Sequence, residues 1–221
     1  IGSVAFWETG SNSAGEFKIM DVYSIDGQLK GHVDPPLPIR NFLSQPNWFL
    51  RDSNFDPDFA ISASQAKWFL QKTLAKNVDG VIAVNLFFVT DILSAIGPVT
   101  LTDFNNEEIN SVNFFVKANN YIQKDFFPGS TQKKDFLTAV SNAIQDRLSN
   151  STNIPWLKLL ASVKNSLDRK NILINTDDKK MQADLEKAGW AGRISDVRCL
   201  GDGNDCLPDY LTINEANLGV N

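Results

Sequence analysis

The feature that most constrains the fold is the apolar run of residues 81–89. This run is rich in Val, Ile and Phe, which is typical of a strand buried on both faces, and it is too short to span a bilayer. We therefore expect a central strand of the parallel type. Thr90 or Asp91 is placed to cap a short amphipathic helix, which Gly97-Pro98 would end. Another extended segment follows at 99–101.

Segments of helical and strand periodicity alternate along the 221 residues. Helical spacing predicts helices over 62–76 (begun by a capping box at 62–65), 110–126, 131–148, 155–168 and 177–188. Strands are predicted over 3–9, 16–25, 171–175 and 210–217. The alternation predicts an α/β fold, a layered α/β/α domain with a central mixed β-sheet. We expect a single domain over 1–221, with a main core over about 1–150 and a helix-strand extension over about 151–221.

Composition excludes one class of partner. The net charge is −5, and no Lys/Arg cluster is interleaved with aromatic residues, so the surface is not built to neutralise a phosphate backbone. We expect no nucleic acid partner. The 15 Phe and five Trp residues indicate a thick aromatic core or a pocket that accepts an apolar group.

The two cysteines, Cys199 and Cys206, lie in a Gly/Asp/Asn-rich turn. One interpretation is a disulfide, which would imply an oxidising, extracytoplasmic compartment, and the other is two free thiols. No His or further Cys is near them in the sequence, which argues against zinc. The single His32 lies in a turn-like segment and argues against a conventional Ser-His-acid triad. No glycine-rich phosphate loop is present.

Charged residues gather in the segment 51–58. Asp52, Asp56 and Asp58 are spaced so that they can hold Mg²⁺, and Arg51 can grip phosphate oxygens in a bidentate fork. Such a group suits phosphoryl transfer, where positioning and charge neutralisation dominate. The alternative is a polar turn whose aspartates cap the next helix.

A second candidate anion site lies at the helix start within 130–135. Hydroxyl groups are followed there by Lys133 and Lys134, and a helix N-terminus favours anions. An ordinary capped helix start is the alternative.

Several segments resemble a bacterial family catalogued as domain of unknown function 4012. The residues that carry this resemblance read DVYSIDGQLKGHVDPPLPI, NWFLRDSNFDPDF, VDGVIAVNLFFVTDILSAIGPVTL and FFPGSTQKKDFLTAV. The closing part, AGWAGRI through DYLTINEANLGVN, resembles the family's continuation. The resemblance implies an extracytoplasmic, envelope-associated domain held to the cell membrane by an anchor upstream of this chain.

More distantly, the order of segments is similar to the LytR-CpsA-Psr family. Those α/β enzymes transfer glycopolymers from a polyprenyl-pyrophosphate carrier to peptidoglycan. The similar positions here are Ser24-Ile25-Asp26, the stretch 78–99 and residues 130–134. The first of these positions, Ser24-Ile25-Asp26, lacks the arginine that the family has there. At the third position, the family's Arg-rich helix start is replaced by Gln132, Lys133 and Lys134. Because lysine cannot reproduce the planar grip of a guanidinium, this resemblance needs an arginine from elsewhere in the chain.

Two functional hypotheses follow from the resemblance. In the first, the domain is a phosphotransferase-like enzyme acting on a lipid-linked glycopolymer. Its catalytic residues are Asp26, Arg51 and Asp52, its ligand-binding residues Arg40, Gln132, Lys133 and Lys134, and its Mg²⁺ ligands Asp52, Asp56 and Asp58. In the second, the fold is kept without catalysis, as a ligand-binding or scaffolding domain of the cell envelope. Clustering of Asp26, Arg51 and Lys133 at one cavity favours the first, and scattered positions favour the second.

Overall fold

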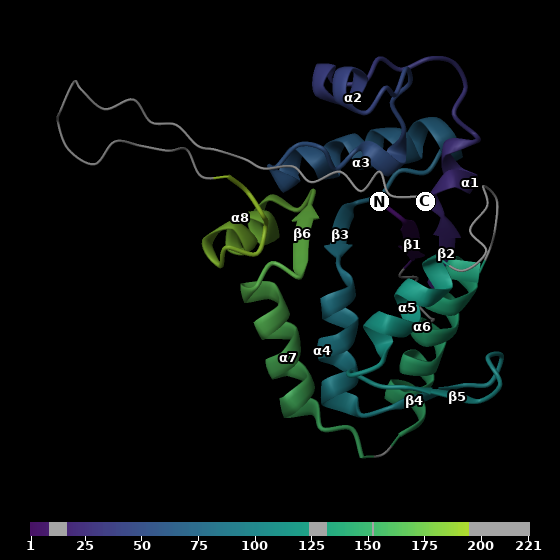
Figure 1. Cartoon of the computed structure of the whole chain (residues 1–221). Coiled ribbons are helices and arrows are strands. Elements are labelled where there is room, and N and C mark those ends of the chain that lie inside the picture. Colours follow the sequence, from purple (N-terminus) through teal and green to yellow (C-terminus); the bar gives the residue numbers. More distant parts are fainter. Residues whose placement is uncertain (9–16, 124–131, 152, 195–221) are drawn as a thin grey trace.

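The computed structural model describes residues 1–8, 17–123, 132–151 and 153–194. They form a mixed α/β structure (Figure 1), which confirms the predicted class. Its first half contains β1 (Ser3–Trp7), β2 (Phe17–Asp21), α1 (Val22–Asp26), α2 (Leu37–Phe42), the 3-10 turn η1 (Leu50–Asp52), α3 (Phe59–Leu74), β3 (Gly80–Val84) and α4 (Leu86–Ile96). The second half contains β4 (Val99–Leu101), β5 (Glu107–Ile109), α5 (Phe114–Gln123), α6 (Gln132–Asn150), α7 (Trp156–Asp168), β6 (Ile172–Thr176) and α8 (Lys179–Lys187).

The described strands pair as three separate antiparallel sheets: β1 with β2, β3 with β6, and β4 with β5. The strands predicted over 3–9 and 16–25 are confirmed as β1 and β2, which pair antiparallel. A central mixed sheet is not seen in the part of the chain that the structure describes, and the parallel strand was a wrong prediction. Hydrophobic periodicity shows that a segment is extended, but it does not show which strand edges meet.

The apolar run that organises the sequence is divided between a strand and a helix. Asn85 is extended and its side chain accepts a hydrogen bond from the amide of Phe88, so α4 begins at Leu86 and needs no cap from Thr90 or Asp91. The strand β3 is therefore short. It is also not buried on both faces, because Ile82 and Val84 are 60% and 55% exposed.

Two further element boundaries differ from prediction because aspartates cap helices. The second strand ends at Asp21, whose carboxylate accepts from the Tyr23 amide and starts α1. Helix α3 begins before the predicted capping box, because Asp58 caps it through the Ala60 amide. The Ser62 hydroxyl instead donates to the carbonyl of Asp56 from a buried position.

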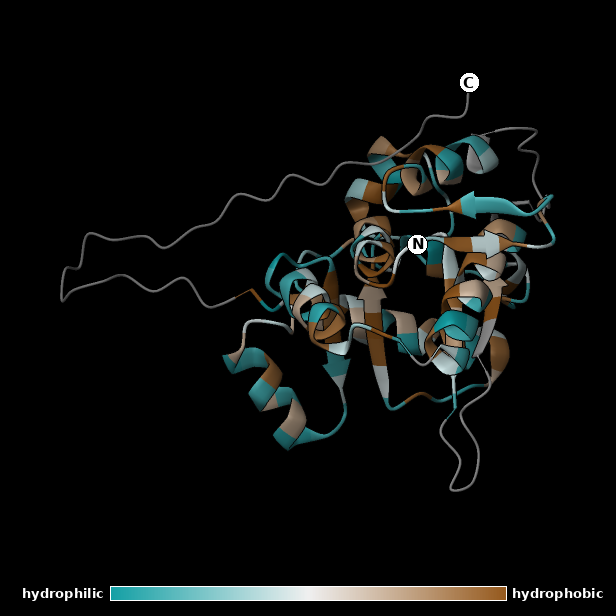
Figure 2. Ribbon diagram, turned by 90° about the horizontal axis from the view of Figure 1, so that it is seen from below, coloured by the Kyte–Doolittle hydropathy of each residue, from teal (hydrophilic) through white to brown (hydrophobic). Residues whose placement is uncertain are grey.

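The core has two clusters. In the first, α3 packs on β1, α1 and η1 through Phe6, Val22, Ile25, Leu50, Ala66, Phe69 and Leu70. In the second, helices α4 to α7 pack with β4 and β5 around Leu93, Ile96, Leu101, Ile109, Phe114, Phe136 and Val140. Hydrophobic and hydrophilic positions alternate along the helical ribbons, as expected for amphipathic helices (Figure 2). No helix in the described ranges is both long and apolar enough to cross a bilayer.

Gly80 is required by the close pairing of β3 with β6. A Cβ atom at this position would lie 2.8 Å from the carbonyl oxygen of Asn175, so one strand must shift. We expect Gly80→Ala to lower the free energy of unfolding by about 1–3 kcal/mol in urea titrations. Gly27→Ala is the matched control, because its Cβ would meet nothing closer than 3.4 Å. Equal losses in the two variants would contradict this explanation.

Candidate functional site

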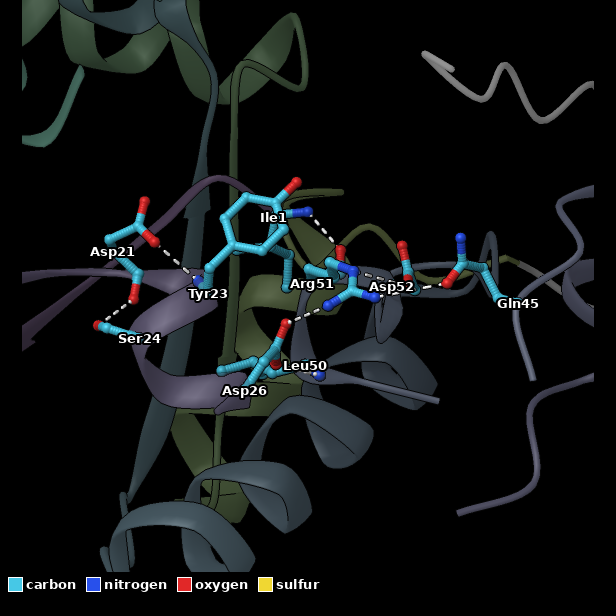
Figure 3. A network of polar contacts seen from close by, with 9 residues as sticks. All are labelled: Ile1, Asp21, Tyr23, Ser24, Asp26, Gln45, Leu50, Arg51 and Asp52. Atoms are coloured by element: carbon cyan, nitrogen blue, oxygen red, sulfur yellow. Dashed lines mark hydrogen bonds and ion pairs between the residues drawn. The ribbon is translucent and has the colours of Figure 1, made fainter. Parts of the chain in front are cut away.

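The predicted catalytic residues Asp26, Arg51 and Asp52 lie together (Figure 3). Asp26, at the end of α1, is only 4% exposed. One carboxylate oxygen accepts from the Leu50 amide at 2.9 Å, and the other lies 3.1 Å from Nη1 of Arg51. A buried carboxylate thus has two charge-assisted contacts to the loop that precedes α3.

Each of the three guanidinium nitrogens of Arg51 has a polar contact with another side chain. Besides Nη1, Nη2 lies 3.5 Å from Oε1 of Gln45, and Nε lies 3.5 Å from Oδ2 of Asp52. The guanidinium carbon also lies 4.2 Å from the ring centroid of Phe49 and 5.4 Å from that of Tyr23, distances that allow cation–π attraction. The group is therefore enclosed by three polar side chains and two rings.

Local structure explains why these groups meet. The turn η1 directs Leu50 into the first core cluster, where it is 1% exposed, and so presents the Leu50 amide to Asp26. The indole Nε1 of Trp48 donates to the carbonyl of Asp52 at 3.2 Å, and the nitrogen of Ile1 donates to the carbonyl of Arg51. The network therefore joins the start of the chain, α1 and the loop before α3.

Burial dominates the electrostatics of both carboxylates. Burial raises the pKa of Asp26, and the nearby Arg51 guanidinium offsets this only in part. Burial likewise raises the pKa of Asp52, and the Arg51 guanidinium again offsets this only in part. Among the described residues, Oδ2 of Asp52 accepts no hydrogen bond although it is buried. The two acids consequently take up protons at higher pH than ordinary aspartates.

The raised pKa of Asp26 predicts a sign for pH dependence. A carboxyl whose pKa is higher in the folded chain binds its proton more tightly there, so its contribution to stability grows as pH falls from the folded-state pKa towards the ordinary value. Asn at this position cannot titrate. In urea titrations, the free energy of unfolding of the wild type should therefore rise relative to that of Asp26→Asn between pH 7 and pH 4.5. If the wild type instead lost stability relative to Asp26→Asn on acidification, the folded-state pKa of Asp26 would be lowered.

The other two predicted Mg²⁺ ligands, Asp56 and Asp58, have roles in the turn before α3. Asp56 accepts from the Asp58 amide at 2.9 Å. Asp58 accepts from the amides of Ala60 at 2.8 Å and Ile194 at 3.3 Å. These contacts match the capping alternative. Within the described ranges, no three His, Cys, Asp or Glu side chains gather as a metal site, and Mg²⁺ binding stays a prediction.

The predicted ligand-binding residues are not placed at this network by any observed contact. Arg40 forms an ion pair with the exposed Asp34, which also lies 3.2 Å from Nε2 of His32. The side chains of Gln132, Lys133 and Lys134 lie outside the described residues, as do Cys199, Cys206 and the predicted strand 210–217.

Two clefts of about 400 Å³ are present elsewhere on the molecule. One lies between β4 and α6, next to Asp103, Asp146 and Arg147, and the other lies against α8 and Trp190. Neither cleft is lined by Asp26, Arg51 or Asp52. The charged network is thus a packed structure rather than the mouth of either cleft.

Sequence reasoning missed Gln45, Phe49 and Tyr23 as neighbours of Arg51. Phe49 stands two residues from Arg51 in the sequence, which is a weak signal for ring stacking. The Leu50 amide carries no sequence signal at all, because any residue except proline supplies an amide. Gln45 and Tyr23 approach only through the tertiary fold.

Comparisons with known proteins give one match. A family model described as Protein of unknown function (DUF4012) matches residues 2–121. The search of curated proteins and the search of solved structures each returned no match. The matched region includes the whole Asp26–Arg51–Asp52 network.

Proposed function

We propose, on the premise that this chain belongs to the Protein of unknown function (DUF4012) family, that it is a non-catalytic ligand-binding domain of the bacterial cell envelope. The observation that carries the non-catalytic part is the engagement of Arg51. All three guanidinium nitrogens have protein partners. A pyrophosphate would compete with these partners, and drawing Arg51 away would leave the buried carboxylate of Asp26 without its cation, which is costly.

Binding is supported by an exposed apolar surface on α4 and α5, which we call the Phe87–Phe115 patch. The two rings stack with centroids 5.8 Å apart, and Phe87 and Phe115 are 57% and 42% exposed. The neighbouring Val112 and Val116 are also exposed. Exposed apolar patches of this kind mark interaction sites more often than single exposed residues do.

A second candidate is phosphotransfer from a polyprenyl-pyrophosphate carrier at a membrane, as the distant LytR-CpsA-Psr resemblance implies. One observation favours it: the three predicted catalytic residues gather, and two of them are carboxyls with raised pKa values. Perturbed carboxyls beside an arginine occur at active sites, but they also occur in structural ion pairs. The contacts that hold Arg51 on Asp26, Gln45 and Asp52 favour the binding function.

A paired assay separates the two. The first arm measures cosedimentation of the full chain with purified peptidoglycan. We expect binding that Phe115→Ser reduces at least about fivefold, roughly 1 kcal/mol, while Trp156→Ser does not change it. Trp156 is a suitable control because it is an exposed aromatic residue on another helix, α7. No cosedimentation of the wild type would contradict peptidoglycan as the envelope ligand of this domain.

The second arm incubates the chain with a short-chain polyprenyl-pyrophosphate glycan, with and without Mg²⁺. We expect no release of polyprenyl phosphate. Mg²⁺-dependent release by the wild type that is lost in a folded Arg51→Gln variant would overturn the non-catalytic proposal and support the enzyme.

A further inference from the structure

Helix α7 presents an apolar face to the outside of the molecule. Its large apolar side chains Trp156, Leu157 and Leu160 are 56%, 86% and 62% exposed. At about 100° per residue these three positions and the exposed Ala161 fall within one arc of the helix. We call these four residues the α7 face.

The opposite side of α7 packs on α4. Leu159 and Ser166 are buried, and the Ser166 hydroxyl donates a hydrogen bond to the carboxylate of Asp91 on α4. The ammonium group of Lys158 donates to the carbonyl of Ser94, also on α4. Figure 1 shows α7 on the outer side of α4. The α7 face is therefore directed away from the helix that holds α7 in place.

The charge beside this face is opposite in sign to that of the whole chain, which has a net charge of −5. Residues 153–170 contain one carboxylate, Asp168, and the four cations Lys158, Lys164, Arg169 and Lys170. All five of these side chains are exposed. Asp168 is already paired with Lys164 at 2.6 Å. Lys158 and Lys170 donate to backbone carbonyls, which do not cancel their charge, so a net positive charge remains beside the apolar face.

We propose that the α7 face docks on the surface of an anionic lipid bilayer. Helices that lie in a membrane interface combine an apolar face with Lys and Arg residues beside it, and tryptophan prefers the headgroup region. The apolar side chains enter the boundary between headgroups and acyl chains, and the cations reach the lipid phosphates. With 13 residues, α7 is shorter than the about 20 residues that span a bilayer, so it lies along the surface.

Charge argues against a second copy of this chain as the occupant of the α7 face. A two-fold contact places the same surface of each copy against the other, and it would bring the cations of 153–170 from both copies together. Like charges that face each other across an interface oppose binding. A bilayer that contains anionic lipids supplies the opposite charge instead.

Cosedimentation of the full chain with phosphatidylglycerol vesicles tests the proposal. We expect binding that the double variant Trp156→Ser/Leu157→Ser weakens at least about tenfold, because two apolar side chains no longer leave water. Both residues are exposed, so the variant should keep the far-ultraviolet circular dichroism of the wild type. Phe115→Ser is the matched control: it removes an exposed ring from the Phe87–Phe115 patch and should leave vesicle binding unchanged.

A second arm uses phosphatidylcholine vesicles, which carry no net charge. Binding to them should be at least about tenfold weaker than to phosphatidylglycerol vesicles, because the attraction of the cations is lost. No binding of the wild type to phosphatidylglycerol, equal binding to the two lipids, or binding that the double variant keeps would each overturn the proposal. A dimer in sedimentation velocity that the double variant abolishes, without vesicle binding, would assign the α7 face to a second copy.

The proposal is independent of the Phe87–Phe115 patch, and the two assays keep the two surfaces apart. With peptidoglycan, Phe115→Ser is the damaging variant and Trp156→Ser the control. With vesicles, the roles are reversed. Loss of peptidoglycan binding alone would therefore leave the membrane surface standing, and loss of vesicle binding alone would leave the proposed function standing.

Discussion

Replacing Asp26 by alanine should lower the free energy of unfolding by about 3 kcal/mol or more at pH 7. The substitution removes the partner of Arg51 and the acceptor of the Leu50 amide at once. Breaking one side of a buried ion pair costs about 3–5 kcal/mol, because the remaining charge keeps its desolvation penalty. We expect the lower end of this range, since Arg51 is 22% exposed and keeps Asp52 nearby. Urea titration followed by circular dichroism measures the loss.

The matched control for this prediction is Asp34→Ala. Asp34 also pairs with an arginine, Arg40, but its side chain is 75% exposed, so its replacement should leave the free energy of unfolding almost unchanged. A double-mutant cycle with Arg51→Met isolates the pair. A loss below 1 kcal/mol for Asp26→Ala, or a coupling energy near zero, would show that the network does not hold the loop in place.

Replacing Phe136 by alanine should cost about 3–5 kcal/mol, because truncating a large buried aromatic side chain leaves a cavity. Phe136 is 1% exposed. Its ring stacks on Tyr121 with centroids 4.6 Å apart and meets Phe104 edge-on at 5.7 Å. Urea titration gives the loss, and near-ultraviolet circular dichroism should show the disturbed aromatic packing.

Phe42→Ala is the control for the aromatic core. Phe42 lies at the end of α2 and is 80% exposed, so its removal should change stability by no more than about 0.5 kcal/mol. If Phe136→Ala were equally mild, α6 would not be docked on the second core cluster as described.

Elements whose signals are local were predictable from the sequence. Helix α7 (Trp156–Asp168) lies almost where its apolar spacing placed it, and β1 and β2 lie within the two predicted strand segments. The prediction for the run 81–89 was wrong, because a short apolar run suits a buried strand or a buried helix equally well. The side chain of Asn85 decided the boundary, and its capping role was not evident from periodicity.

The candidate site was predictable in part for the same reason. Asp52, Asp56 and Asp58 look alike in the sequence, yet Asp58 caps a helix while Asp52 turns towards Arg51. Asp26 was chosen through a family resemblance and Arg51 through the charged segment 51–58, and the structure brings the two together. Their actual partners, the Leu50 amide and Gln45, depend on tertiary contacts that residue types do not encode.

The bonds at the start of α3 determine which pieces of this chain can exist alone. The Phe59 amide donates to the carbonyl of Gly192, and Asp58 receives the Ile194 amide. Strand β3 likewise takes its partner from residues 172–176. The partners Gly192, Ile194 and 172–176 lie beyond residue 121, where the family match ends. The end of the family match is therefore not a folding boundary, and during synthesis β3 has no partner strand until the ribosome has released residues 172–176.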